Sequence, residues 1–368
     1  MSKNVKSKVL VIGPMSSGHI QKWVDPIIND YEFVFFTLHN SSTSTTYRGH
    51  KVKAFPKLTN TKLDFLFALP YLLYLMLRIK PNLIHAHFLS SYGLMVGLAC
   101  PRNVPKILST WGTDVNGKVQ KSAMLKHLVK VVSNKFITVN APAHHMKEKM
   151  VKLGFDEDAI EVFQYGIDLD SYPTKSIDEM KGGVSFLSIR NWDELYNIEN
   201  LISGYQVYCR NTNTASKLVL LGRGPASQEK KILKLISSLD FGAGEVIVKG
   251  FVDSETLKST IYQADVLISI PSMDGAPLSV LEAAYVGLIP VLSNIDANHE
   301  WFNAKNAVFV EPQNIESIAN GIEQAVKIVQ SDHADKVMCE NREKIVHSAS
   351  YQINTRRMKN LYEQLLEG

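Results

Sequence analysis

The sequence predicts an α/β protein built from two doubly wound parallel sheets, and three observations lead to this fold class. Short apolar runs alternate with helical patterns along nearly the whole chain. Most of these runs are continuously apolar, which is typical of parallel strands buried on both faces. Eleven runs are too many for one ordinary sheet. Because strand–helix alternation with right-handed crossovers gives doubly wound sheets, we expect two Rossmann-like domains that face a cleft.

The expected strands fall into two groups, separated by a polar, proline-containing stretch at residues 168–183. The first group comprises residues 8–13, 32–38, 83–87, 106–109 and 136–139, and the second comprises 184–189, 218–221, 246–249, 266–270, 289–293 and 307–310. A helical pattern at 199–209 places its apolar residues on one face. We therefore expect a first domain over residues 1–167 and a second over 168–350.

Composition and charge limit the class of protein. The 368 residues are 45% hydrophobic and 21% charged, and the net charge of +4 does not suggest a nucleic-acid binder. Three distant cysteines form neither a disulfide framework nor a metal cluster, so we expect a reducing, cytoplasmic location. The longest apolar stretch, residues 65–77, is too short to cross a bilayer.

The charge is distributed unevenly along the chain. Residues 1–165 contain 21 basic and 10 acidic side chains, whereas residues 166–368 contain 19 basic and 26 acidic side chains. A basic half joined to an acidic half points to two domains with different partners.

The segment from Ser269 to Asn294 carries the strongest chemical signal. A predicted strand ends near Pro271, and a tight loop with Asp274 and Gly275 leads to Pro277, which fits the first turn of a helix. The free N–H groups and partial positive charge of a helix start make an anion site. Glu282, further along the helix, reaches back toward the same ligand.

This segment, Asp274-Gly-Ala-Pro-Leu-Ser-Val-Leu-Glu282, resembles the Glu-x7-Glu motif of retaining, nucleotide-sugar-dependent glycosyltransferases of family 4, which have the GT-B fold. Other signatures of the family occur in the expected order. They lie at residues 13–23, 84–87, 109–114, 165–168, 221–225, 249–251, 264–265 and 271–272. The resemblance therefore covers nearly the whole chain.

By this resemblance the second domain binds a nucleoside-diphosphate sugar. Glu282 would accept hydrogen bonds from the ribose, Asp274 would lie beside the transferring sugar, and the guanidinium of Arg190 would stabilise charge on the leaving diphosphate. The loop at 249–251 would flank the base. The expected donor contacts are Arg190, Gly222, Gly250, Phe251, Asp274, Gly275, Ala276, Leu278 and Glu282.

The resemblance also implies acceptor-side residues in the first domain. They are Gly18, His19, His87, Trp111 and Asp114. His87 has an alternative role as a hydrogen-bonded residue at a strand end, and Asp114 has one as a turn cap. The C-terminal helix, residues 351–368, is expected to pack back onto the first domain.

Three residues depart from the family pattern. Tyr196 stands where the family usually has a lysine, Asp274 is shorter than the usual glutamate, and Trp111 replaces a common histidine. Asp168 and Asp170 have the spacing of a metal-binding pair but fall at the domain junction. We therefore expect metal-independent transfer with no cofactor.

Residues 118–135 combine five lysines with apolar residues. This pattern is typical of a basic amphipathic helix that lies on an anionic bilayer, to which residues 65–77 would add an apolar face. The alternative is a core-facing helix with a solvated lysine face. Nucleic acid is not an expected partner, because no aromatic stacking set accompanies the lysines.

Together these features predict a retaining hexosyltransferase that acts on a glycan or lipid-linked acceptor. The enzyme would act in cell-surface polysaccharide or lipopolysaccharide synthesis. It would be located in the cytoplasm, bound peripherally to the inner face of the cytoplasmic membrane. The alternatives are a non-catalytic homologue that binds a partner or glycan, and a nucleotide-sugar epimerase of the same fold.

Overall fold

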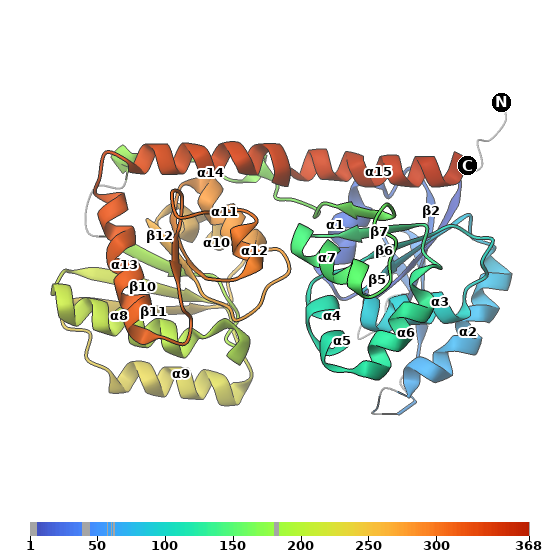
Figure 1. The fold of residues 1–368 in the computed structure, drawn as a ribbon, viewed down its shortest axis with the longest axis horizontal. Helices are drawn as coiled ribbons and strands as arrows, with labels where there is room; N and C mark the ends of the chain where they lie inside the picture. Colours follow the sequence, from blue (N-terminus) through green and yellow to red (C-terminus); the bar gives the residue numbers. More distant parts are fainter. Residues whose placement is uncertain are drawn as a thin grey trace. The chain divides into compact units, whose positions relative to one another are not determined.

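The computed structural model describes residues 6–38, 45–56, 58, 59, 61, 63–179 and 184–367. The chain divides into two compact units. Unit 1 consists of Met1–Tyr165 and Tyr351–Gly368, and unit 2 of Gly166–Ser350. Each unit contains a parallel or mostly parallel sheet with helices on both faces, which is the α/β class that the sequence predicts (Figure 1).

Unit 1 is built on an eight-stranded sheet of order β3-β4-β2-β1-β5-β6-β7-β8. Neighbouring strands are parallel except for the β3–β4 hairpin at one edge. The strands are β1 (Lys8–Ile12), β2 (Glu32–Leu38), β3 (Thr46–Tyr47), β4 (His50–Phe55), β5 (Leu83–His87), β6 (Lys106–Ser109), β7 (Thr138–Ala141) and β8 (Ile160–Val162).

Helices cover both faces of this sheet because its strands are apolar on both sides. Leu10 and Phe36 belong to one core cluster with α2, α3, α6 and α7, whereas Val11 and Phe35 belong to the other with α1 and α15. The helices are α1 (Gly18–Val24), α2 (Asp64–Ile79), α3 (Leu94–Ala99), α4 (Thr113–Asn116), α5 (Lys118–Lys121), α6 (Ala123–Ser133), α7 (His144–Lys152) and α15 (Tyr351–Glu367). This two-sided burial explains the continuous apolar runs.

Unit 2 is built on a six-stranded parallel sheet of order β11-β10-β9-β12-β13-β14. Its strands are β9 (Ser185–Ser188), β10 (Ser216–Leu221), β11 (Gly244–Gly250), β12 (Val266–Ser269), β13 (Ile289–Ser293) and β14 (Val308–Val310). Its helices are α8 (Ile198–Thr212), α9 (Ala226–Ser238), α10 (Ser254–Tyr262), α11 (Leu278–Val286), α12 (Asp296–His299), α13 (Ile315–Val329) and α14 (Ala334–Ala349). The order reverses between β9 and β12, and ligands of open α/β sheets bind beside such a switch point.

All eleven expected strands are present, with small shifts at their ends. Three further strands, β3, β4 and β8, were not predicted. In β4 the polar residues His50, Lys51 and Lys53 interrupt the apolar pattern because the strand lies near the sheet edge and is half exposed. β3 and β8 are only two and three residues long.

The stretch expected to link the two domains, residues 168–183, is largely part of unit 2. Its residues 180–183 lie outside the described residues. Earlier in the stretch, buried Lys175 forms an ion pair with Asp265 at 3.2 Å, and its backbone N–H donates to Val286. A bridge between Ile167 and Ser350 also holds the start of unit 2 to its end. No helix in the described part of the chain is both long enough and apolar enough to span a membrane.

Candidate functional site

The predicted donor residues of unit 2 gather at the carboxyl ends of four neighbouring strands. Arg190 follows β9, Gly222 follows β10, Gly250 ends β11, and Asp274 lies in the loop after β12. The sheet order β11-β10-β9-β12 places these strand ends side by side. Residues distant in the sequence therefore share one edge of one sheet, which is where ligands of open α/β sheets bind.

Arg190 is held in place by two neighbours. Its Nε donates to Ser269 Oγ at 2.7 Å, and a terminal nitrogen forms an ion pair with Asp274 Oδ2 at 2.8 Å. The Arg190 and Asp274 side chains are 11% and 16% exposed. The other Asp274 oxygen accepts the Gly275 backbone N–H at 2.7 Å. The Asp274 carboxylate thus binds both a guanidinium and a backbone amide, the two kinds of donor that would hold a phosphate.

Tyr196, which stands where the family usually has a lysine, lies beside the Arg190 guanidinium. It lies in a short 3₁₀ helix, Glu194–Tyr196, and the Arg190 guanidinium carbon is 5.6 Å from the centroid of its ring. Burial raises the pKa of the Tyr196 hydroxyl. The aromatic ring therefore supports the guanidinium from one side, where a lysine would have added a second positive charge.

Asn197 holds the loops after β9 and β12 together. It adopts a positive φ of 53°, which asparagine tolerates better than most residues. Its side-chain amide donates to Ile270 O at 2.8 Å and to Ser272 Oγ at 2.9 Å, and the Ser272 N–H donates to Leu195 O. These bonds bring the loop that carries Asp274 against the loop that follows Arg190.

Two glycines at this edge have a positive φ, and one of them allows close approach of the backbone. Gly222 has φ +91°, and a Cβ there would lie 2.4 Å from Arg190 O. Its N–H donates to Gly250 O at 2.9 Å, so the loops after β9, β10 and β11 are in contact. Gly250 also has a positive φ, and the next residue, Phe251, exposes 74% of its surface. An exposed aromatic ring at this position is suited to stacking on a flat ligand.

The helix of the predicted anion site, α11, begins at Leu278, with Pro277 immediately before it rather than in its first turn. The Leu278 N–H donates to Ala276 O at 2.9 Å, and the Gly275 N–H is bonded to Asp274. The amides of Gly275 and Leu278, which the sequence assigned to the donor, therefore have internal partners in this structure.

Glu282 lies in the second turn of α11 and is partly buried. The Tyr172 side chain forms a hydrogen bond with it, and burial followed by the charge of Glu282 raises the pKa of the Tyr172 hydroxyl. Sequence reasoning missed Tyr172, together with the Arg190 partner Ser269. Tyr172 lies outside the motifs used, whereas Ser269 begins the segment that carries Asp274 and Glu282 but was not assigned a role there.

The predicted acceptor-side residues of unit 1 occupy the corresponding edge of its sheet. His19 contacts two aromatic side chains there: its ring centroid lies 4.6 Å from that of Trp111 and 5.5 Å from that of Tyr165. His87 ends β5, and its ring lies 6.2 Å from that of Trp111. Gly18 begins α1, and a Cβ there would meet no neighbour within 4 Å, so its small size is not required by packing.

His87 and Trp111 contain buried polar atoms without hydrogen-bond partners. Within the part of the chain that the structure describes, neither ring nitrogen of His87 nor Nε1 of Trp111 has a partner. Burial, together with His85 and His19, lowers the pKa of His87 well below its usual range. A neutral imidazole and an indole N–H without partners are suited to binding the hydroxyl groups of a ligand.

His85 has a structural role. Its Nδ1 lies 2.6 Å from the Tyr362 hydroxyl of α15, and its Nε2 lies 2.8 Å from Ser109 Oγ. Burial lowers the pKa of His85 to about 3. α15 is therefore fixed to the sheet of unit 1 by a buried hydrogen bond as well as by apolar packing.

Asp114 caps its own loop. Its carboxylate accepts backbone N–H groups from Leu89 at 2.7 Å, Trp111 at 3.0 Å and Gly112 at 2.9 Å. Burial raises its pKa, and these backbone hydrogen bonds act in the opposite direction. This geometry matches the turn-cap alternative for Asp114.

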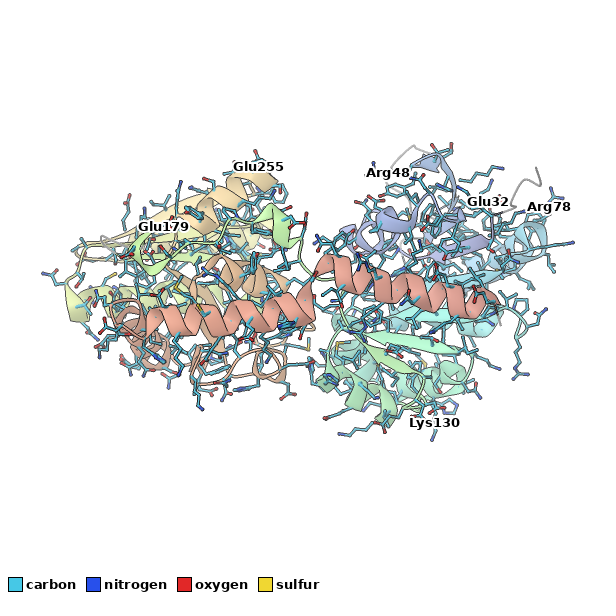
Figure 2. All side chains as sticks on the ribbon, turned by 90° about the horizontal axis from the view of Figure 1, so that it is seen from above. Glu32, Arg48, Arg78, Lys130, Glu179 and Glu255 are labelled. Atoms are coloured by element: carbon cyan, nitrogen blue, oxygen red, sulfur yellow. The ribbon has the colours of Figure 1, made fainter. Side chains whose placement is uncertain are left out.

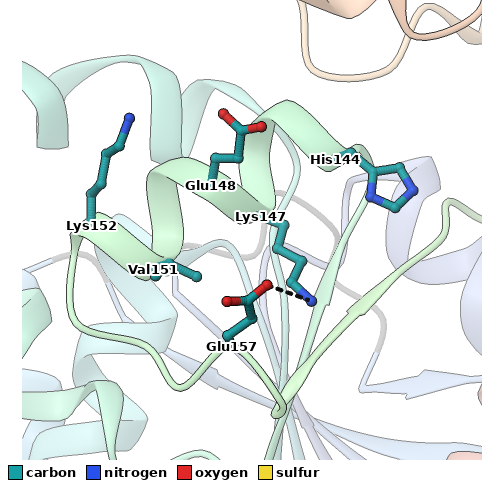
Figure 3. Close-up of a pocket in the computed structure, with 6 residues that line it drawn as sticks. All are labelled: His144, Lys147, Glu148, Val151, Lys152 and Glu157. Carbon is teal, nitrogen blue, oxygen red and sulfur yellow. Dashed lines mark ion pairs between the residues drawn. The ribbon is translucent and has the colours of Figure 1, made fainter.

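A separate cavity of about 480 Å³ lies on unit 1, beside α7 (Figure 3). It is lined by His144, Lys147, Glu148, Val151, Lys152 and Glu157. The Lys147–Glu157 ion pair, 3.7 Å long, crosses it. The predicted site residues do not line this cavity. Among the described residues, no group of three or more His, Cys, Asp or Glu side chains is arranged to hold a metal ion.

Two family models match this chain, one within each of its two units. Residues 8–141 match the family described as Glycosyl transferase 4-like, and residues 175–342 match Glycosyl transferases group 1. No protein of curated function matches the sequence significantly.

Solved structures with the same fold cover nearly all of the chain. The Anabaena protein HepE, in complex with UDP and glucose, has a TM-score of 0.78 at 13% identity over 97% of this chain and 100% of its own. Sucrose-phosphate synthase from Thermosynechococcus elongatus has a TM-score of 0.78 at 14% identity, over 98% and 100%. A glycosyltransferase from Rickettsia africae has a TM-score of 0.72 at 14% identity, over 99% of both chains.

Proposed function

The chain belongs to the family-4-like glycosyltransferases of the GT-B fold, and from this premise we propose that it transfers a hexose from a nucleoside diphosphate to a hydroxyl group with retention of configuration. The observation that carries the proposal is the cluster of Arg190, Asp274 and Gly275 at the carboxyl edge of the unit 2 sheet. Glu282 of α11 would bind the ribose, and Phe251 would stack on the base.

The proposed reaction exchanges one bond at the anomeric carbon. The bond to the diphosphate oxygen breaks, and the acceptor oxygen bonds to the same face of the sugar. The departing diphosphate oxygen takes the acceptor's proton. Arg190 stabilises the negative charge on that oxygen, which accounts for catalysis without a metal ion or cofactor. Asp274 orients the sugar.

The acceptor in this proposal is a glycan or a lipid-linked glycan, held by unit 1. His19, His87 and Trp111 supply aromatic surface and unpartnered polar atoms at the carboxyl edge of its sheet. A role in cell-surface polysaccharide or lipopolysaccharide synthesis, at the cytoplasmic face of the membrane, is consistent with the basic character of this unit.

Calorimetric titration with UDP, GDP and dTDP tests the donor site directly. UDP is the first candidate, because HepE has been seen with it. We expect one of the three to bind. Replacing Arg190 with Gln should weaken that binding by about 1.5–3 kcal/mol, or roughly 10- to 100-fold, which is the usual worth of a hydrogen bond to a charged group.

A matched control is Arg210→Gln, which removes an exposed arginine from α8 of the same unit. It should bind nucleotide as the wild type does. Failure of all three nucleotides at millimolar concentration would favour the non-catalytic homologue. Turnover of a nucleotide sugar without any acceptor, with epimerised sugar as the product, would favour the epimerase.

A further inference from the structure

One face of α2 is apolar and exposed to solvent. Its inner face, with Ala68, Leu72, Leu75 and Met76, is buried in the core of unit 1. Its outer face carries five exposed apolar side chains: Leu66 (59% exposed), Phe67 (49%), Leu73 (43%), Tyr74 (53%) and Leu77 (65%). They recur at helical spacing, so they form a continuous stripe. Exposed apolar stripes of this kind usually mark an interaction surface.

The stripe continues over the neighbouring helices. α2 contacts α3, and α3 packs closely on α6, where a Cβ on Gly97 would lie 2.4 Å from Val132. These three helices form one layer on the same face of the sheet (Figure 1). Leu98 of α3 and Met124 of α6 add exposed apolar surface.

The exposed charges on this layer are all positive. Between Phe33 and Lys147 the sequence contains only two acidic residues, Asp64 and Asp114, and both are buried. The same stretch carries many exposed cations: Arg78, Lys80, Arg102, Lys118, Lys121, Lys126 and Lys130. Arg78 and Lys130 project outward from unit 1 (Figure 2). None of the helices α2, α3, α5 and α6 therefore exposes a carboxylate that would balance its own positive charge.

The structure also corrects the expectation of one amphipathic helix at residues 118–135. The segment consists of two helices, α5 and α6, separated at Ser122. Its apolar residues Val119, Val129 and Val132 are buried in the core, so they are not available to a membrane. α5 and α6 present lysines to solvent, whereas the exposed apolar surface is provided mainly by α2.

We propose that the layer formed by α2, α3, α5 and α6 binds an anionic phospholipid bilayer, with the outer face of α2 in the interface and the lysines of α5 and α6 near the lipid headgroups. An apolar face and a basic cluster supply the two contributions that stable but reversible membrane binding requires. A second copy of the chain fits less well, because a two-fold contact would bring two positive surfaces together. Nucleic acid would leave the apolar stripe uncovered.

This surface is independent of the donor site. The residues proposed to bind the nucleotide sugar all lie in unit 2, and α2, α3, α5 and α6 all lie in unit 1. Membrane binding can therefore fail while sugar transfer is retained, and the reverse also holds. For a transferase with a lipid-linked acceptor, the surface would bring unit 1 to its substrate.

Co-sedimentation of the full chain with phospholipid vesicles tests the proposal. We expect binding to vesicles that contain phosphatidylglycerol and much weaker binding to phosphatidylcholine alone. The triple variant Leu66→Gln/Tyr74→Gln/Leu77→Gln should reduce binding at least about tenfold, because each position loses apolar surface placed in the interface. Lys121→Gln/Lys126→Gln should abolish most of the preference for anionic lipid.

A matched control changes three exposed apolar residues elsewhere, Leu233→Gln/Val346→Gln/Ile353→Gln on α9, α14 and α15. It should bind vesicles as the wild type does, and circular dichroism should show all variants folded. Absence of binding by the wild type, or equal binding by the α2 variant, overturns the proposal. The proposal is also overturned if the protein forms a dimer without lipid and the α2 substitutions dissociate it. The same holds if the lysines bind DNA while the protein does not bind vesicles.

Discussion

Replacing Asp274 with Asn should make a nucleoside diphosphate bind more tightly, although Asp274 belongs to the proposed donor site. In this structure its carboxylate accepts hydrogen bonds from Arg190 and from the Gly275 amide. A diphosphate that binds to Arg190 must compete with this carboxylate. Asparagine has nearly the same shape and retains one acceptor oxygen for Gly275, but it lacks the charge that opposes the phosphate.

The size of the effect follows from the environment of the ion pair. Exposed pairs contribute about 0–1 kcal/mol, whereas two unit charges about 4 Å apart near a protein surface interact by about 4 kcal/mol. The Arg190 and Asp274 side chains are 11% and 16% exposed, which places the pair between these limits. We expect the substitution to strengthen binding by about 1–2 kcal/mol, or roughly 5- to 30-fold.

Isothermal titration of the wild type and the Asp274→Asn variant with UDP measures this difference, and a transfer assay with UDP-glucose should show the opposite change in rate. Asp193→Asn is the control, since it removes the same charge from an exposed position nearby. Equal tightening in both variants would assign the effect to net charge. Unchanged or weaker binding in Asp274→Asn would refute the competition.

Three further predictions concern the ribose contact of Glu282, its hydrogen bond with Tyr172 and the dependence of stability on pH. Glu282→Gln should weaken binding of a ribonucleoside diphosphate about tenfold, because a charge-assisted hydrogen bond to the ribose is lost. Binding of an analogue without ribose hydroxyls should not change. Tyr172→Phe should raise the donor KM more than it changes kcat, because Glu282 loses a hydrogen-bond partner. The free energy of unfolding should be highest above pH 6.5 and fall as the pH drops toward 4. Burial holds the pKa of His19 at about 4 and that of His85 at about 3 in the folded protein, whereas both side chains have a pKa near 6.5 in the unfolded chain. Each histidine contributes up to about 1.4 kcal/mol per pH unit in this interval. Urea titrations at pH 7 and pH 5 measure the loss, and an equal loss in His19→Gln would mean that His19 does not contribute.

Much of the fold could be predicted from the sequence because parallel strands buried on both faces have a strong pattern. β2, β5, β6 and β13 have the expected bounds. The motif segments also predicted which residues reach the carboxyl edge of each sheet, since that placement follows from strand ends alone. β4 could not be predicted in the same way, because its half-exposed position permits lysines and leaves little apolar periodicity.

The sequence could not predict which side chains of the site bind each other. Arg190 and Asp274 were both identified, but nothing in their spacing indicates that they bind each other or that Ser269 fixes the guanidinium. The sequence predicted that residues 65–77 would add an apolar face, but not which of their side chains are exposed. A helix that is apolar all round is usually buried, and only packing shows which of its faces remains uncovered.

The Arg190–Asp274 pair connects these points to the proposed transfer reaction. Tyr196 stands in place of a family lysine and adds no positive charge, and the charge of Arg190 is balanced by Asp274. A diphosphate with two or more negative charges attracts the guanidinium more strongly than one carboxylate does. Its binding would release Asp274 next to Gly275, where the sugar attached to that diphosphate must lie. The same step that places the leaving group on Arg190 would thus free one Asp274 oxygen to orient the sugar, while the other oxygen keeps its bond to the Gly275 N–H.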